Sequence, residues 1–368
     1  MKNISVPFND LSRIHDPLIK KIDSKIQKMV KESSFILGKY VEEFENNYSN
    51  FTNSKYTIGC ANGTDAIEIV LRALEIKQND EVIIPSNTFI ATALAVSNSG
   101  AIPVFADNDK NYLLDIEKVE SLITKNTKAI IGVNLYGQMG FNKQLSEISK
   151  KYNLYFIEDS AQAHGALQNG KSPGYFSIAS TYSFYPGKNL GAWGDGGCVT
   201  TNNKKLADQI LYLRNWGSKK KYFHNKQGFN SRLDPIQAII LNEKLNQLDK
   251  WNSYRNEVAD YYLEHLDDSL ILPYPLKYNY HVWHLFVIRI KNRNKVMKLG
   301  NENGIEFGIH YPKPIHRQKA YRKSKQYLNN IGNVDKYSSQ LLSLPIYPYM
   351  KKKEYQQVTD FLNNVKNK

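Results

Sequence analysis

The sequence predicts an α/β protein in which a large domain, with a mainly parallel mixed sheet covered by helices, precedes a smaller C-terminal α+β domain. Short apolar runs alternate with helical patterns through the first two-thirds of the 368-residue chain. This alternation is typical of a parallel sheet with helices on both faces. A long helical pattern then begins near residue 235 and leads into a segment with its own strand and terminal helix. We therefore expect a large domain over residues 1–245 and a small domain over residues 246–368.

The expected strands and helices follow one another in a regular order. Apolar runs predict strands at 55–61, 80–85, 101–107, 128–137 and 154–159. Helical patterns lie beside them at 64–76, 89–100, 115–124 and 142–153. In the C-terminal part we expect one long helix over 235–266, a strand at 282–290 and a helix at 353–365. Ligands of parallel sheets bind beyond the carboxyl ends of the strands, so functional residues should directly follow the apolar runs.

The composition is that of a globular protein rather than a membrane or disulfide-rich one. Hydrophobic residues make up 41% of the chain, and no apolar run is long enough to span a membrane. The N-terminus lacks the pattern of a secretory signal, and two cysteines, Cys60 and Cys198, are too few for a disulfide framework or a metal cluster. We expect a cytoplasmic protein without a metal site.

The formal net charge of +14 comes from lysines that are mostly scattered along the chain. Scattered lysines are typical of a solvated surface, and charge speaks about solubility and partners rather than fold. A nucleic-acid-binding protein is therefore an alternative that only the charge supports, and we expect no nucleic-acid partner.

The stretch "ANGTDA" follows the first predicted strand and opens a predicted helix. The backbone N–H groups of Gly63 and Thr64 would then be free donors at a helix N-terminus, which suits a phosphate. The alternative is a plain N-cap formed by Thr64.

Two more polar segments follow predicted strands or precede a predicted helix. Asp159, in "IEDSAQAHG", ends an apolar strand and could either cap a helix or pair with a buried cation. Asn230, in "QGFNSRLD", lies just before the long helix, where a turn and an N-cap are the simpler explanation.

The stretch "SFYPGKNLGAWGDGG" surrounds a single lysine, Lys188, with glycines and aromatic residues, and Ser183 ends the strand before it. Most lysines in loops are exposed and charged. A lysine held against apolar walls loses hydration, however, so the pKa of its ammonium falls and it becomes a usable amine nucleophile.

Together these segments describe a site for pyridoxal phosphate. This cofactor needs a lysine for its covalent attachment, a carboxylate for its pyridine nitrogen, donors for its phosphate and a flat group against its ring. Lys188, Asp159 and the helix start at Gly63 and Thr64 supply the first three. Phe89, after the strand at 80–85, is a candidate for the ring face.

Six motifs in order resemble the DegT/DnrJ-type nucleotide-sugar aminotransferases, which are pyridoxal-phosphate enzymes of fold type I. The motifs are "ANGTDA", "PSNTFIATA", "EDSAQAHGA", "SFYPGKNLGAWGDGG", "GFNSRLD" and "GIHYPKPIHRQ". The resemblance runs nearly end to end. It implies that Lys188 bonds to the cofactor and shuttles protons, that Asp159 pairs with the pyridine nitrogen, and that Gln162 lies beside the ring.

The resemblance also implies how the phosphate is held and how the chain assembles. The phosphate would be bound by Gly63, Thr64 and Ser183. Asn230 would reach the phosphate of the neighbouring subunit, so the resemblance implies a homodimer with shared active sites.

The resemblance is greatest to enzymes acting on dTDP-linked 3-keto-6-deoxyhexoses. His310, Tyr311 and His316 would then lie near the sugar or nucleotide. Some relatives carry His in place of the lysine and act as dehydratases, so Lys188 favours transamination. Asn134 stands where many relatives have His, which puts the exact sugar in doubt.

The resemblance thus implies conversion of a dTDP-3-keto-6-deoxyhexose to the 3-amino-3,6-dideoxyhexose, with glutamate as amino donor, for a surface-polysaccharide sugar. Amination at C4 and a UDP-linked sugar are the enzymatic alternatives. A regulatory or binding protein that retains the fold without the chemistry is the non-enzymatic one.

Overall fold

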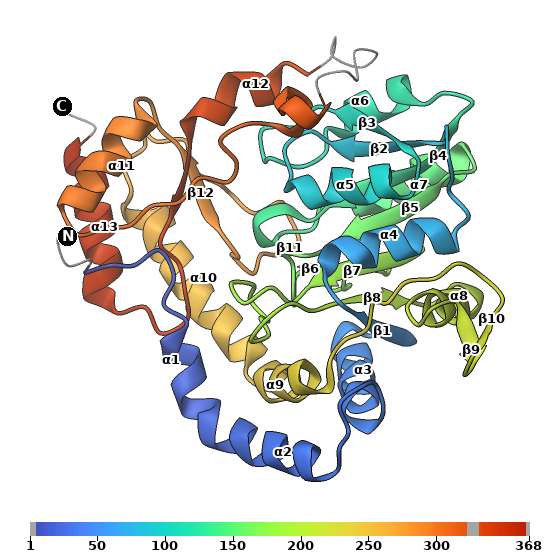
Figure 1. Ribbon diagram of the computed structural model, residues 1–368. Coiled ribbons are helices and arrows are strands. Elements are labelled where there is room, and N and C mark those ends of the chain that lie inside the picture. Colours follow the sequence, from blue (N-terminus) through green and yellow to red (C-terminus); the bar gives the residue numbers. More distant parts are fainter. Residues whose placement is uncertain (1–4, 322–330, 366–368) are drawn as a thin grey trace.

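A seven-stranded sheet forms the centre of the computed structural model, which describes residues 5–321 and 331–365 (Figure 1). Its spatial order is β1-β8-β7-β5-β4-β2-β3. Strand β8 runs antiparallel to β1 and β7, and the pairs from β7 to β3 are parallel. The strands are β1 Tyr56–Cys60, β2 Glu81–Pro85, β3 Ile102–Ala106, β4 Thr127–Val133, β5 Tyr155–Asp159, β7 Ala179–Ser183 and β8 Gly197–Thr201. The prediction of a mainly parallel mixed sheet is confirmed.

Helices cover both faces of this sheet because its central strands are apolar on both sides. Val82 and Ile84 of β2 face one core, whereas Ile83 between them faces another. The first core lies under α4, α5 and α8, and the second lies under α6 and α7. These helices are α4 Gly63–Ala73, α5 Ile90–Asn98, α6 Ile116–Val119, α7 Asn142–Lys151 and α8 Lys204–Leu213.

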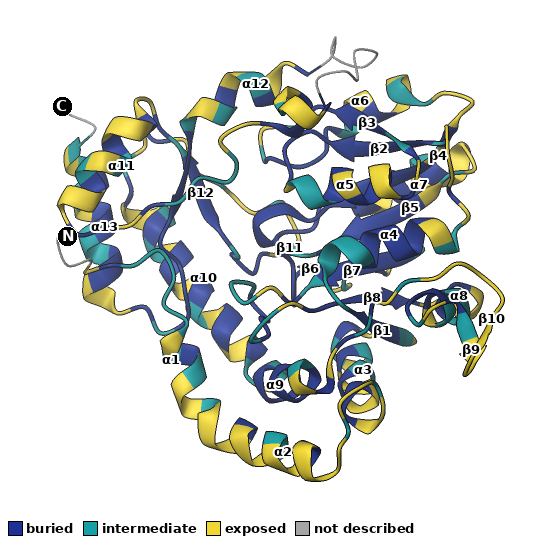
Figure 2. Ribbon diagram, viewed as in Figure 1, coloured by how far each residue is buried: buried dark blue, intermediate teal, exposed yellow. Residues whose placement is uncertain are grey.

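The N-terminal helices and α9 pack together beside the sheet. Figure 1 shows α2 at the periphery of the molecule, and Figure 2 shows that most of its surface is exposed while the central strands of the seven-stranded sheet are buried. These elements are α1 Ser12–His15, α2 Ile19–Lys31, α3 Lys39–Thr52 and α9 Pro235–Leu245. None of the helices within the described residues is long and apolar enough to cross a membrane.

The C-terminal part has its own small core, in which β12 pairs antiparallel with β13. Its elements are α10 Leu248–His265, β12 Phe286–Arg289, α11 Arg293–Glu302, α12 Asn333–Tyr337, β13 Leu341–Leu344 and α13 Lys352–Val365. The single long helix expected over 235–266 is wrong, because the chain breaks into α9 and α10 at residues 246 and 247. The domain boundary predicted after residue 245 falls at this break and stays a prediction.

The N-terminal residues differ from the predicted division of the chain into domains. Val6, at the start of the described chain, forms a parallel bridge with Ile305 and lies in the C-terminal core. The remaining strands are short pairs outside the main sheet: β6 Leu167–Gln168 with β11 Asn279–Tyr280, and β9 Ser218–Lys220 with β10 Phe223–His224.

Parallel pairing brings the ends of β4, β5 and β7 to one edge of the sheet. Val133 pairs with Asp159, and Asp159 pairs with Thr181, so Ser183 ends its strand beside them. The candidate site is built at this edge.

Candidate active site

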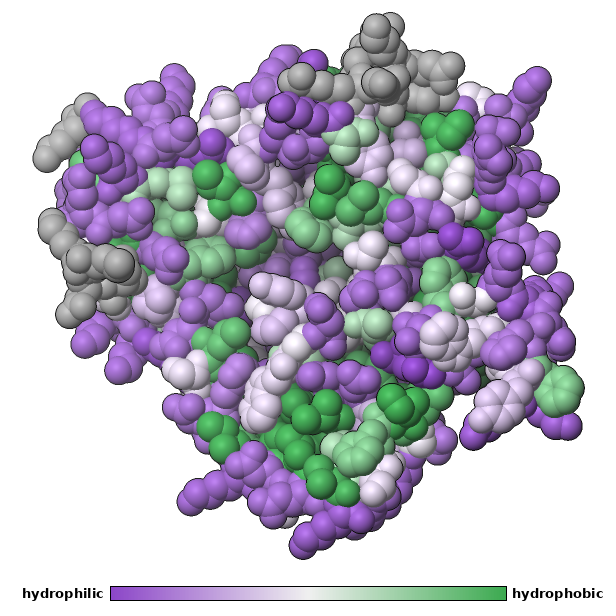
Figure 3. Space-filling model, in the orientation of Figure 1, coloured by the Kyte–Doolittle hydropathy of each residue, from purple (hydrophilic) through white to green (hydrophobic). Residues whose placement is uncertain are grey.

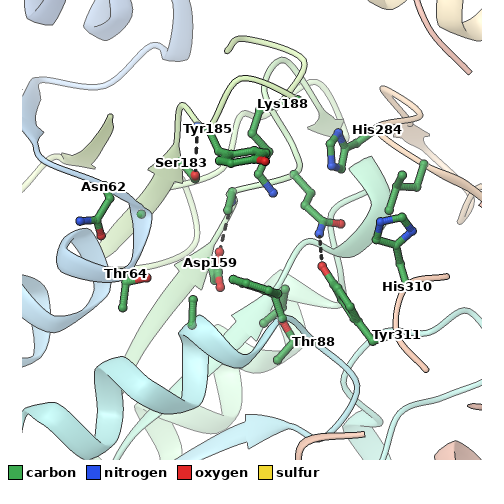
Figure 4. A pocket seen from close by; sticks show the side chains of 18 of the residues that line it. Asn62, Thr64, Thr88, Asp159, Ser183, Tyr185, Lys188, His284, His310 and Tyr311 are labelled. Carbon is green, nitrogen blue, oxygen red and sulfur yellow. Dashed lines mark hydrogen bonds between the residues drawn. The ribbon is translucent and has the colours of Figure 1, made fainter. Parts of the chain in front are cut away.

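A cavity of about 650 Å³ lies at the carboxyl edge of the sheet, between the large and C-terminal parts. The large part contributes strand-end and helix-start residues, the C-terminal part contributes the 284–285 and 310–311 segments, and the N-terminus contributes residues 8 and 9. Figure 4 shows Thr64 and Ser183 on one side, His310 and Tyr311 on the other, and Lys188 and Asp159 between them. The cavity therefore has two ends, with one amine and one carboxylate at its centre.

The loop that carries Lys188 is held in shape by its own backbone. The N–H of Lys188 donates to the carbonyl of Tyr185 at 2.9 Å, and the N–H of Ala192 donates to the carbonyl of Phe184 at 2.8 Å. A Cβ atom at Gly191 would lie 2.3 Å from the carbonyl oxygen of Pro186, so only glycine allows this close approach. The glycines of this stretch thus allow a tight loop that aims the lysine into the cavity.

Lys188 is partly buried, and burial lowers the pKa of its ammonium to about 8. The negative charge of Asp159 opposes this shift. A pKa of about 8 leaves roughly a tenth of the amine uncharged at pH 7, far more than an exposed lysine has. Lys188 is therefore suited to act as a nucleophile.

Asp159 is buried at the end of β5, and both of its carboxylate oxygens have partners. Oδ2 accepts a hydrogen bond from Thr92 Oγ1 at 2.8 Å, and Oδ1 accepts one from the N–H of Ala161 at 3.1 Å. Burial raises the pKa of this carboxyl, whereas the two donors and the nearby Lys188 charge oppose the rise. The side chain is thus fixed in orientation beside the amine.

The helix start at α4 differs in one respect from the sequence prediction. Asn62, not Thr64, is the N-cap, and its side chain accepts a hydrogen bond from the N–H of Asp65 at 2.8 Å. This leaves the N–H groups of the first helical residues, Gly63 and Thr64, without helical partners. A Cβ atom at Gly63 would lie 2.7 Å from Cβ of Ser183, so the strand end and the helix start approach closely. The structure thus brings Gly63, Thr64 and Ser183 together at one end of the cavity.

The two residues expected beside a bound ring also line the cavity. Gln162 Oε1 accepts a hydrogen bond from the N–H of Tyr136 at 2.7 Å, and its Nε2 donates to the hydroxyl of Tyr311 at 3.1 Å. Phe89 is 54% exposed and its ring lies 5.8 Å from that of Tyr311. Gln162 is therefore fixed by its neighbours, whereas Phe89 is free to contact a ligand.

Imidazoles surround Lys188. His284 and His310 line the cavity, and His164 lies behind Ser183, with its Nε2 2.9 Å from the Ser183 carbonyl oxygen. Burial lowers the pKa of all three, and the positive charge of Lys188 lowers them further. These rings are neutral at physiological pH, so they add no positive charge beside the amine.

Three residues singled out from the sequence lie outside the lining of the cavity. His316 is buried, and its Nε2 lies 3.1 Å from Oδ1 of Asp335. Asn230 is exposed and pairs with Asn215. Asn134 is fully buried, and its side chain joins a polar network around Glu158, to which it donates at 2.9 Å.

Several lining residues were not predicted from the sequence. Asn62 and Tyr185 lie inside the motifs "ANGTDA" and "SFYPGKNLGAWGDGG", so the predicted site residues next to them could have indicated that they line the cavity. His284 and Arg255 come from apolar or helical patterns without a local feature that marks them. Phe8 and the residue after it reach the cavity from the N-terminus, and no local pattern indicates this.

Comparison with known proteins assigns the chain to a family. A model of the DegT/DnrJ/EryC1/StrS aminotransferase family matches residues 17–363. The chain belongs to this family. It is 46% identical over 360 residues to a dTDP-3-amino-3,6-dideoxy-alpha-D-galactopyranose transaminase of Aneurinibacillus thermoaerophilus, and the match covers 97% of this chain and 99% of that protein.

Solved structures of aminotransferases superpose on the whole chain. The crystal structure of DesV of S. venezuelae in complex with a ketimine intermediate has a TM-score of 0.96 and 37% identity, and covers 99% of each chain. The structure of NtdA of Bacillus subtilis with bound cofactor PMP has a TM-score of 0.93 and 32% identity, and covers 100% of this chain and 86% of that one. The chain is thus an aminotransferase of a pyridoxal-phosphate-dependent family, and the predicted fold, enzyme class and cofactor are confirmed.

The residues of the cavity fit this cofactor. The amine of Lys188 and the buried carboxylate of Asp159 are close enough to interact electrostatically. The donors of a helix N-terminus lie at one end, where the dipole favours a phosphate. The donor set therefore matches each part of pyridoxal phosphate.

Proposed function

We propose that the protein transfers an amino group, with glutamate as donor, to the C3 carbonyl of a dTDP-linked 3-keto-6-deoxyhexose, giving the 3-amino-3,6-dideoxyhexose of a surface polysaccharide. The observation that carries the proposal is the partly buried Lys188, with its pKa of about 8, beside the fixed Asp159 carboxylate. The relative at 46% identity, whose name gives a product of this class, supports the dTDP-linked sugar. The two free, buried cysteines fit a cytoplasmic location.

Each proposed role follows from a contact in the cavity. When bound, pyridoxal phosphate supplies an electron sink for the substrate carbon that loses or gains a proton. Gly63, Thr64 and Ser183 would hold its phosphate, and Phe89 would pack against its ring. Gln162, whose amide is held in place by Tyr136 and Tyr311, would lie beside the ring.

Asp159 and Lys188 are the two catalytic residues in this proposal. Asp159 keeps the ring nitrogen protonated, because a fixed carboxylate stabilises that positive charge. Nζ of Lys188 would remove the α-carbon proton of the amino donor in one half-reaction, and would deliver a proton to C3 of the sugar in the other. Its lowered pKa makes both transfers possible near neutral pH.

His310 and Tyr311 form the substrate end of the cavity. The backbone carbonyl of His310 accepts a hydrogen bond from the hydroxyl of Tyr136, and its Nδ1 lies 2.8 Å from the hydroxyl oxygen of Ser343. The ring of His316 pairs with Asp335 and lies outside the lining of the cavity, so we propose no direct substrate contact for it.

The substrate is tested with a panel of acceptors. The enzyme is incubated with glutamate and with dTDP- and UDP-linked 3-keto and 4-keto sugars, and products are identified by mass spectrometry and NMR. We expect amination at C3 of a dTDP-3-keto-6-deoxyhexose. Preferred amination at C4, or of a UDP-linked sugar, would replace the proposed substrate, and no amination of any sugar would contradict the proposed function.

We also propose a homodimer in which each subunit completes the site of the other. Figure 3 shows an apolar patch on the lower part of the visible face, where Figure 1 has α2, α3 and α9. Large apolar residues of this region are exposed at Val30, Phe35, Ile36 and Ile236. Asn230 is exposed and outside the cavity of its own chain, so it is available to a second subunit. Apolar patches of this kind are typical of subunit interfaces.

Shared sites predict complementation between two inactive variants. A Lys188→Ala protomer mixed with an Asn230→Ala protomer should form heterodimers in which one site lacks both groups and the other keeps both. Activity should therefore rise above that of either variant alone once subunits exchange. Mass spectrometry of differently tagged protomers confirms the exchange, and exchange without any gain in activity would show that Asn230 does not serve the partner's site.

A further inference from the structure

A chain of buried side-chain amides connects His164 to His284 behind the loop that carries the lysine. Nδ2 of Asn252 donates to the carbonyl of His164 at 2.9 Å, and Oδ1 of Asn252 accepts a hydrogen bond from Nδ2 of Asn189 at 2.9 Å. Nδ2 of Asn189 also donates to the carbonyl of Val282 at 2.8 Å. A backbone carbonyl can only accept a hydrogen bond. The two carbonyl groups therefore fix the orientation of both amides.

This orientation assigns the proton on the ring of His284. Oδ1 of Asn189 lies 3.1 Å from Nδ1 of His284. Because Oδ1 is an acceptor, Nδ1 must carry the ring proton. Burial, followed by the positive charges of Lys188 and Arg255, lowers the pKa of this ring well below its usual value. The ring is therefore neutral, and Nε2 holds an unshared electron pair that can accept a hydrogen bond.

Nε2 of His284 faces the cavity. Asn189, on the Nδ1 side of the ring, is buried and lies outside the cavity lining, whereas His284 is partly exposed and belongs to the lining. Within the described residues the ring makes its one hydrogen bond through Nδ1. Nε2 is not among the fully buried polar atoms that lack a partner, so it keeps accessible surface.

The ring also lies close to the reacting amine. Figure 4 shows His284 beside Lys188, on the side of the cavity that holds His310. The charge of Lys188 is the largest influence on the His284 ring after burial. A substrate whose reacting carbon lies at Lys188 can therefore reach Nε2 with a group on a neighbouring carbon.

We propose that Nε2 of His284 accepts a hydrogen bond from the hydroxyl group on C2 or C4 of the acceptor sugar and so contributes to the choice of sugar. This inference rests on the proposed function, which places C3 at Lys188. The two hydroxyls are on the carbons next to C3, and a hydroxyl donates readily to a neutral imidazole nitrogen. The carboxylates of glutamate only accept hydrogen bonds at neutral pH, so the amino donor makes no such bond with Nε2.

The test removes the acceptor and each hydroxyl group separately. Calorimetry uses the enzyme loaded with pyridoxamine phosphate, because this amine does not react with an amino sugar. The probes are dTDP-3-amino-3,6-dideoxygalactose, its two analogues that lack the C2 or the C4 hydroxyl, and dTDP. His284→Asn removes the acceptor at Nε2, while the amide nitrogen of asparagine can take the place of Nδ1 as a donor to Asn189.

His284→Asn should weaken binding of the complete amino sugar about five- to tenfold, which corresponds to one neutral hydrogen bond. Wild-type enzyme should bind one of the two deoxy analogues more weakly than the complete sugar by the same factor. The variant should bind that analogue as wild type does, within about twofold, because the hydrogen bond is already absent. Binding of dTDP should also change less than about twofold.

Two controls separate a sugar contact from damage to the site. His265→Asn makes the same exchange at an exposed histidine outside the cavity lining and should leave binding of all four probes unchanged. The glutamate half-reaction, followed by the cofactor absorbance in single turnovers, should keep its rate in His284→Asn.

The wild-type measurement alone can overturn the proposal, since equal binding of the complete sugar and both analogues would show that neither hydroxyl is bound. Equal losses for the complete sugar and both analogues in His284→Asn, or a matching loss in the glutamate half-reaction, would assign His284 a structural role only. Unchanged binding of the complete sugar would show that Nε2 makes no contact. If wild-type enzyme binds no sugar nucleotide of the acceptor panel more tightly than the free nucleotide, the proposed function fails and the role of His284 with it.

Discussion

Replacing Lys188 with alanine is expected to slow amino transfer by at least about 10²- to 10⁴-fold, the usual contribution of a positioned proton-transfer group. The loss should be greater still if covalent attachment of the cofactor also speeds the reaction. The measurement is the steady-state rate with glutamate and the preferred keto sugar. The protein should still bind cofactor without a covalent bond, because the contacts to its phosphate and ring remain.

A matched control distinguishes this effect from a general loss of charge. Lys204 is an exposed lysine that pairs with Asp208 at 3.1 Å, and Lys204→Ala should retain full activity. Circular dichroism and thermal melting check that both variants fold. Near-normal turnover of a folded Lys188→Ala variant would mean that another amine performs the reaction.

Replacing Asp159 with asparagine is expected to reduce turnover by about 10²- to 10³-fold, the usual cost of removing one fixed electrostatic partner of the reacting group. Asparagine keeps the size of the side chain and can still accept the hydrogen bond that Thr92 donates at 2.8 Å. The protonated ring nitrogen would lose its charge partner, so kcat should fall while the cofactor remains bound.

Asp208→Asn, at an exposed carboxylate 43% accessible to solvent, serves as the control and should keep wild-type kcat. The cofactor content of each variant is measured by its visible absorbance before the rates are compared. A fully loaded Asp159→Asn variant with unchanged kcat would show that a different acid pairs with the ring.

Local patterns made most of the large part predictable. The alternation that predicted the sheet reflects strands such as β2, whose side chains enter two separate cores, and strand ends then indicated Asp159 and Lys188. Each of these signals lies within about ten residues of the chain. Features that depend on neighbouring residues, such as the glycine-rich loop around Lys188, could therefore be predicted from the sequence.

The rest of the site depends on contacts between distant segments. Asn9 reaches the cavity because the N-terminal segment bridges to Ile305 at Val6. His284 lies in an apolar run whose pattern predicts a core strand. His316 belongs to the same motif as His310 and Tyr311, which line the cavity, but its own ring lies 3.1 Å from Asp335 and outside the lining, so its place near the ligand stays a prediction. Proximity along the chain does not decide which side chains share a cavity.

The most direct test of the central assignment is to identify the lysine that bonds to the cofactor. The yellow enzyme is reduced with sodium borohydride, digested, and its peptides are mapped by mass spectrometry. We predict that the cofactor adduct is found on Lys188, in the peptide that contains "SFYPGKNLGAWGDGG". An adduct on any other lysine, or no adduct in a protein that holds the cofactor and is active, would contradict the account.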